Sequence, residues 1–163
     1  MNQITVRFLV ALAGLGSAAV LGGAFAFQYI GGLAPCTLCL WQRWPHAAAI
    51  LIMVLALMWK PTPWLLVLGA IAAMTTAGIG FFHVGVEQGW WEGLTSCSGG
   101  SISGISVDDL LNPNADVAAP VRCDEIAWSL FGISMAGWNM IASLGFAAIW
   151  GMAFTKLPAS KNQ

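Results

Sequence analysis

The sequence predicts an all-α membrane protein, in which four transmembrane helices form a bundle and a long loop joins the third helix to the fourth. Two observations indicate this class. Of the 163 residues, 58% are hydrophobic and only 8% are charged, and the mean hydropathy is +0.78, unlike an ordinary soluble domain. The charged residues also leave four runs without Asp, Glu, Lys or Arg, at 8–42, 44–59, 61–86 and 126–155.

The four helices follow from these runs in order. A spanning helix needs about 20 mostly apolar residues, which the first, third and fourth runs supply alone. The second run has 16 residues and would rise only about 24 Å as a helix. Because Lys60 opens the turn "KPTP", this helix can be extended only backwards, past Arg43. We therefore predict helices at about 8–29, 36–59, 64–86 and 132–154, in a single membrane domain that covers residues 1–163.

A cleaved signal peptide is the alternative for the first helix. Arg7, the apolar stretch and the small residues "AFA" at 24–26 fit such a signal. The apolar stretch at 8–27 is longer than the core of about 7–15 residues that a signal peptide usually has, so a membrane helix is favoured.

The positive charges predict the orientation. Four of the six flank the N-terminus, the second connection and the C-terminus, and the positive-inside rule places these parts in the cytoplasm; the residues are Arg7, Lys60, Lys156 and Lys161. All seven acidic residues lie between 87 and 125, which predicts a water-exposed loop at about 87–131. Tryptophans near the predicted helix ends indicate an interfacial belt, formed by Trp41, Trp44, Trp59, Trp64, Trp90, Trp91 and Trp150.

All four cysteines then lie on the outer side. Cys36 and Cys39 are at the outer end of the second helix, and Cys97 and Cys123 are in the long loop. A zinc site is disfavoured because the loop cysteines do not form a second close pair, and haem attachment is excluded because residue 40 is leucine. Structural disulfides and redox chemistry both stay open at this point.

The Cys-x-x-Cys pair favours redox chemistry, because closing so short a ring constrains the unfolded chain little. If Pro35 is the first helical residue, both cysteines lie in the first turn, where the helix dipole stabilises a thiolate. At about 100° per residue, Cys36, Cys39, Arg43 and His46 share one helical face. Stacked below two cysteines, Arg43 is expected to face a partner or a cavity; the alternative is that it snorkels to the headgroups. We expect His46 to be an interfacial or packing residue.

The motifs resemble one known family. They are "PCTLCLWQR" at 35–43, the separate pair Cys97 and Cys123, and "CDEIAWSLFGISMAGWN" at 123–139. Together with the four-helix layout, they are similar to the disulfide bond formation protein B (DsbB) family of bacterial inner-membrane thiol oxidoreductases. The resemblance covers nearly the whole chain.

The resemblance implies a relay of electrons. The Cys97–Cys123 disulfide would oxidise a periplasmic DsbA-type dithiol protein, with Cys97 attacked first. Cys36 and Cys39 would reoxidise the loop pair, through a transient Cys36–Cys123 bridge, and Cys39 would pass the electrons to membrane quinone, either ubiquinone or menaquinone. Arg43 matches the family arginine beside the quinone ring, and His83 is the nearest match to a second quinone contact.

The resemblance also implies a place in the cell. The chain would cross the bacterial inner membrane with both termini in the cytoplasm and its cysteines on the periplasmic side. Its partners would be the DsbA-type protein, lipid and the quinone pool, with no nucleic acid and no metal.

Two other functions are alternatives. A four-helix structural or adhesion protein with disulfide-stapled outer loops explains the topology and the cysteines, but it does not explain Arg43 below a Cys-x-x-Cys pair. A quinone enzyme of the vitamin K epoxide reductase type shares four helices and two cysteine pairs, but the order of its motifs fits less well.

Overall fold

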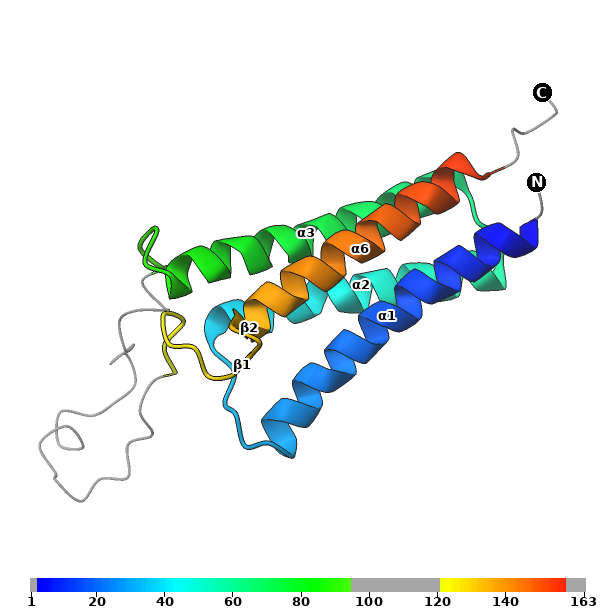
Figure 1. Cartoon of the computed structure of the whole chain (residues 1–163). Helices are drawn as coiled ribbons and strands as arrows, with labels where there is room; N and C mark the ends of the chain where they lie inside the picture. The colour runs from blue at the N-terminus through cyan, green and yellow to red at the C-terminus, as the bar shows by residue number, and fades with distance from the viewer. Residues whose placement is uncertain (1–2, 95–120, 158–163) are drawn as a thin grey trace, which may run out of the picture.

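The computed structural model describes residues 3–94 and 121–157. Its long helices are α1 (Gln3–Tyr29), α2 (Thr37–Met58), α3 (Pro63–Glu87) and α6 (Met135–Thr155). All four are long and apolar enough to cross a membrane, which confirms the predicted class. Figure 1 shows them side by side, with the start of α1, the α2–α3 connection and the end of α6 at one end of the bundle.

The predicted helix bounds need small corrections, of which the start of α2 matters most. Pro35 is not its first residue, because Cys36 is the N-cap, with an extended backbone (φ −76°, ψ 171°). The Sγ atom of Cys36 accepts a hydrogen bond from the backbone N–H of Cys39 at 3.3 Å. In the same way Ser134 caps α6, by accepting from Gly137 N–H at 3.2 Å, so α6 begins three residues later than predicted. A capping side chain thus fixes both starts.

The apolar core lies in the half of the bundle nearest the termini. Val6 and Val10 of α1, Leu66 of α3 and Trp150 of α6 are fully buried in it. The prediction that Trp150 belongs to an interfacial belt is therefore wrong. Its indole fills space that Gly69 leaves open, since a Cβ at Gly69 would lie 2.6 Å from the ring. The other six tryptophans of the predicted belt are at least 36% exposed, as a belt requires.

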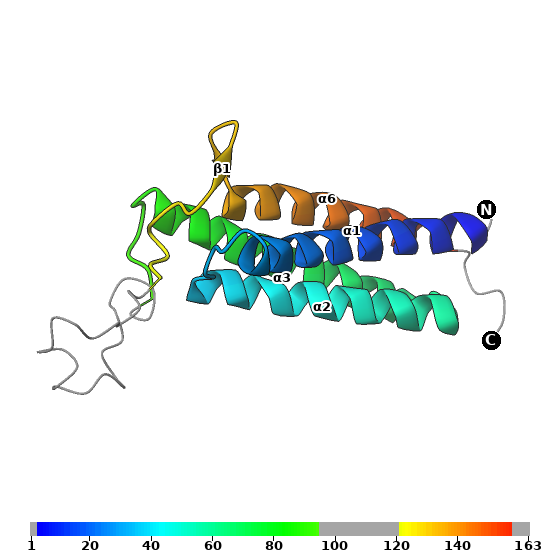
Figure 2. The ribbon, with the colours of Figure 1, turned by 90° about the horizontal axis from the view of Figure 1, so that it is seen from below.

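A short hairpin, which we did not predict, precedes α6. Strands β1 (Ser129–Leu130) and β2 (Ile133–Ser134) pair antiparallel, with Leu130 opposite Ile133. The turn residues Phe131 and Gly132 both have positive φ, at 53° and 77°, as the tight turn of a two-residue hairpin requires. Figure 2 shows the hairpin projecting from the bundle beside the start of α6.

Candidate active site

Cys36 and Cys39 lie together at the start of α2. Both are free, their Sγ atoms are 3.0 Å apart, and Cys36 is only 5% exposed. The hydrogen bond with the Cys39 thiol lowers the pKa of Cys36 below that of an ordinary cysteine, and His83 and the Cys39 N–H act in the same direction. Burial opposes this shift, but does not reverse it. Cys36 is therefore poised as a thiolate, the form that attacks disulfides.

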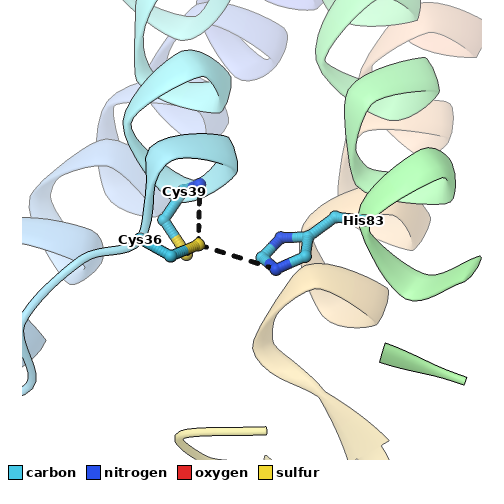
Figure 3. Close-up of side chains that lie close together, drawn as sticks. All are labelled: Cys36, Cys39 and His83. Atoms are coloured by element: carbon cyan, nitrogen blue, oxygen red, sulfur yellow. Dashed lines mark hydrogen bonds between the residues drawn. The ribbon is translucent and has the colours of Figure 1, made fainter. Parts of the chain in front are cut away.

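His83 joins the cysteine pair from α3. Its Nε2 atom is 3.6 Å from Cys36 Sγ and 3.2 Å from the carbonyl oxygen of Cys123. Figure 3 shows the imidazole ring facing the two sulfur atoms across the gap between α2 and α3. Cys123 is fully buried, is disulfide-bonded and belongs to the same apolar cluster as Cys36. Cys97 lies outside the described residues, so its predicted pairing stays a prediction.

Glu87 contacts His83, and its predicted place in the water-exposed loop is wrong. It is the last residue of α3, and its side chain is only 5% exposed. Its carboxylate accepts a hydrogen bond of 2.5 Å from the Ser134 hydroxyl, and its Oε1 atom is 3.8 Å from His83 Nε2. The acid thus ties the N-cap of α6 to the end of α3.

The amide of Gln42 fixes the proton of His83. Its Nε2 atom lies 3.2 Å from the Leu38 carbonyl oxygen, which can only accept, so this end of the amide is the NH₂ group. The same NH₂ group donates to His83 Nδ1 at 3.1 Å. His83 therefore carries its hydrogen on Nε2, facing Cys36.

The other end of this amide reaches α6. Gln42 Oε1 accepts a hydrogen bond from Asn139 Nδ2, which also donates to Thr76 Oγ1 at 3.1 Å. The Asn139 oxygen consequently points the other way and accepts from His46 Nε2 at 2.8 Å. His46 is 3% exposed, so of the two predicted roles the structure supports packing and not an interfacial position. Our sequence reasoning missed Gln42 and Asn139; the available signal was a polar amide within each apolar helix.

A cavity of about 420 Å³ opens beside the cysteines. Its apolar walls come from α1, α6 and the hairpin, and include Val20, Ala24, Phe27, Leu130, Trp138 and Ala142. Its polar side chains are Cys39, Gln42, Arg43, His46, His83 and Asn139. Three of the four residues of the predicted stripe along α2, Cys39, Arg43 and His46, therefore line one cavity, and the fourth, Cys36, does not. The prediction that Arg43 faces a cavity is confirmed.

Two side chains of α1 contact Arg43. Its Nη1 atom donates to Gln28 Oε1 at 2.7 Å, and its Cζ atom lies 4.8 Å from the centroid of the Phe25 ring. Its Nε atom is buried without a hydrogen-bond partner in the described part of the chain. The side chain therefore bridges two helices and keeps one donor unused beside the cavity.

Cys36, Cys39 and His83 have the ligand types of a metal site, with their donor atoms within 4.8 Å of one another. The position of the hydrogen on His83 argues against a metal site. A ligating Nε2 must offer a lone pair while the other ring nitrogen donates its N–H. Here Nδ1 accepts from Gln42, so Nε2 carries the hydrogen. The arrangement suits a hydrogen bond to a thiolate better than a metal ion.

Comparison with known proteins agrees with the site. The family model of "Disulfide bond formation protein DsbB" matches residues 6–153. "Disulfide bond formation protein B 2" of Pseudomonas syringae pv. syringae is 32% identical, covering 91% of this chain and 88% of the relative. "Disulfide bond formation protein B" of Hahella chejuensis is 28% identical (95% and 97%), and that of Methylococcus capsulatus is 30% identical (91% and 93%). No solved structure matches the chain.

Proposed function

The chain belongs to the DsbB family, and from this premise we propose which of its residues carry the reaction. It is a membrane thiol oxidoreductase, and its family implies reoxidation of DsbA with quinone as the electron acceptor. Family membership sets aside both the structural and the vitamin K epoxide reductase alternatives. The observation that carries the assignment of residues is the cavity, because Cys39 and Arg43 share its wall.

The cavity fits a quinone. A quinone needs hydrogen-bond donors for its ring oxygens and an apolar path for its tail. Arg43 keeps an unused buried donor, and the remaining walls are largely apolar. When bound, the quinone supplies an acceptor for two electrons and two protons. Ubiquinone and menaquinone both meet these requirements. Arg43 would hold a ring oxygen, and its charge would favour both the Cys39 thiolate and the reduced oxygen.

The cysteines would act in two exchanges and one oxidation. A thiolate of the DsbA-type partner attacks Cys97 of the Cys97–Cys123 disulfide, and the partner's second thiol resolves the mixed bond, which leaves the loop pair reduced. Cys123 then attacks Cys36 of the Cys36–Cys39 disulfide, and Cys97 reforms its bond with Cys123. The Cys36–Cys39 dithiol returns to the disulfide and releases two electrons and two protons. The shared cluster of Cys36 and Cys123 supports the middle exchange.

His83 would assist these exchanges from the side. Its Nε2–H faces Cys36 Sγ and the carbonyl oxygen of Cys123, so it can stabilise a thiolate on Cys36 as that sulfur is released. His83 also lines the cavity, as a quinone contact requires.

We place the cysteines on the periplasmic side of the bacterial inner membrane. Arg7 lies near the start of α1, Lys60 in the connection between α2 and α3, and Lys156 directly after α6. Figure 1 shows these three segments at one end of the bundle, and the start of α2, which Cys36 caps, at the opposite end. The positive-inside rule then places both termini in the cytoplasm.

The test of this function is quinone reduction by the purified protein. With a reduced DsbA-type partner, we expect a short-tail ubiquinone to be reduced catalytically, and Cys39→Ser to lower turnover by at least about a hundredfold. Trp44→Phe is the control, because Trp44 is 77% exposed. Full turnover by Cys39→Ser would contradict the role of that thiol.

A mixed disulfide tests the order of the relay. In Cys123→Ala, the Cys97 thiolate should attack the disulfide of the oxidised DsbA-type partner and release one of the partner's thiols. The mixed disulfide should accumulate because no second loop thiol is present to attack it, and it should be visible on non-reducing gels and by mass spectrometry. An adduct on Cys36 with Cys97 unmodified would show that the order is wrong.

A further inference from the structure

We propose that His46 is a further binding residue of the cavity, whose Nδ1 atom accepts a hydrogen bond from a hydroxyl group of the reduced carrier, the quinol. This inference rests on the proposed quinone site. It assigns the cavity an acceptor that prefers the product of the reaction to its oxidised form.

The first observation is an unused nitrogen. His46 lines the cavity and is 3% exposed, yet its buried Nδ1 has no hydrogen-bond partner among the described residues. Buried polar atoms are nearly always paired, because an unpaired one loses its water without replacement. A ligand in the cavity with a matching polar group removes this cost.

The second observation decides which group matches. The NH₂ end of Gln42 faces the Leu38 carbonyl oxygen, so its oxygen accepts from Asn139. The Asn139 oxygen must then accept from His46 Nε2, which therefore carries the hydrogen. In the neutral ring, Nδ1 is left with a lone pair and no hydrogen. It can bind a donor such as a hydroxyl group, and it cannot donate to a carbonyl oxygen.

The contrast with Arg43 gives the site its selectivity. Arginine has only donors, so Arg43 can serve the carbonyl oxygens of a quinone. The Nδ1 atom of His46 can only accept, and of the two carrier forms only the quinol would offer it a hydroxyl donor. The other titratable groups on the cavity wall are Cys39 and His83. Asn139 is the positioning residue, because it holds the His46 hydrogen on Nε2.

The test measures binding of both carrier forms to the full-length protein freed of endogenous quinone. The probes are a short-tail ubiquinone and the corresponding ubiquinol. We expect His46→Leu to weaken ubiquinol binding about tenfold and ubiquinone binding less than about twofold. The midpoint potential of the bound carrier should fall by about 30 mV, which is the same tenfold ratio for a two-electron couple.

A matched pair of amides locates the acceptor. The oxygen of His46→Asn can stand where Nδ1 stood, so this variant should keep most of the preference for ubiquinol. His46→Gln places its polar end near the former Nε2 position and should lose the preference. In the wild type, the ¹⁵N resonance of His46 Nδ1 should move on adding ubiquinol and stay on adding ubiquinone. This measurement needs no variant, and therefore holds even if one fails to fold.

The outcomes separate this inference from the proposed function. If the wild type binds neither carrier form, the quinone site itself is wrong, and the inference falls with it. If the wild type binds both forms, but His46→Leu or His46→Gln weakens both equally or neither, only the inference is overturned. An unchanged Nδ1 resonance with ubiquinol bound would also overturn only the inference.

Discussion

Two glycines on the inner faces of the bundle have opposite surroundings. At Gly69, in the half nearest the termini, an added Cβ would lie 2.6 Å from the indole of Trp150. At Gly23, in the half nearest the cysteines, it would meet no atom within 4 Å, and this residue lines the cavity. One half is held by close apolar packing. The other leaves space, and its helices are joined instead by hydrogen bonds from Gln42, His46 and Asn139.

This difference separates stability from chemistry. Close packing gives the terminal half its fixed geometry, because dispersion contacts and rigid rings leave few alternatives. The cysteine half lacks those contacts, and its directional hydrogen bonds hold side chains around an open space. Substitutions in the two halves should therefore affect different measurements.

Among the substitutions that compare the two halves, the largest effect is expected from Arg43→Met, in the open half. It keeps a long side chain but removes the charge and the donors. The apparent KM for quinone should therefore rise about ten- to a hundredfold, because a hydrogen bond from a charged group to the quinone is lost. Turnover should fall as well if the charge assists the thiolate, because an interaction made only in the transition state appears in kcat. Quinone-dependent turnover at matched amounts of folded protein measures both.

Arg43→Lys refines this prediction. The ammonium keeps the charge but lacks the planar fork, so its kinetics should fall between the other two forms. The snorkelling alternative predicts that lysine equals arginine, and that Arg43→Met lowers only the stability. Unchanged quinone kinetics in Arg43→Met would rule out our assignment.

A smaller effect, on stability alone, is expected from Gly69→Ala in the packed half. The new methyl group must displace the indole of Trp150, which should cost about 1–3 kcal/mol of unfolding free energy. The matched control is Gly78→Ala on the same helix, where a Cβ meets nothing within 4 Å. It should be neutral or slightly stabilising, because alanine favours a helix. Equal unfolding curves for the two variants would show that the close packing is unimportant.

The smallest change is expected in the pH dependence of Cys36 alkylation. Its lowered pKa keeps the thiolate populated below the ordinary cysteine value, which is about 8.5. The stabilisation that this shift gives the folded state is complete above the ordinary value, and is lost as the pH falls through the folded pKa. Between pH 8 and 6.5, the folded protein should lose less than about twofold in rate, and the unfolded chain about twentyfold.

Peptide mass spectrometry can assign the alkylated cysteine. An equally steep decline in the folded and the unfolded protein would mean that the hydrogen bonds to Cys36 do not stabilise its thiolate.

The sequence predicts the helices well because the membrane imposes a simple rule of length and polarity. The charge-free runs therefore gave four helices, with ends wrong by a few residues where Cys36 and Ser134 act as caps. The stripe of Cys39, Arg43 and His46 was also predictable, since it depends on the spacing within one helix.

Contacts between segments that are distant in the sequence were harder to predict. His46 and Asn139 are 93 positions apart, and nothing local to either indicates the bond. Trp150 was misplaced because an indole near a helix end suits both the interface and the core. Only Gly69, far away in the sequence, decides between them. Glu87 was misplaced because its partner, Ser134, is 47 positions away.

Gln42 makes the two histidines of the cavity wall depend on each other. An amide has two unlike ends, so it cannot offer the same group to both sides. If His83 moved its hydrogen from Nε2 to Nδ1, the Gln42 amide would have to rotate and lose the Leu38 carbonyl. Its NH₂ group would then meet that of Asn139, which would have to turn as well and leave His46 Nε2 facing a donor. Moving the hydrogen of His83 would therefore break the hydrogen bonds that keep the hydrogen of His46 on Nε2, although the two rings do not bond to each other.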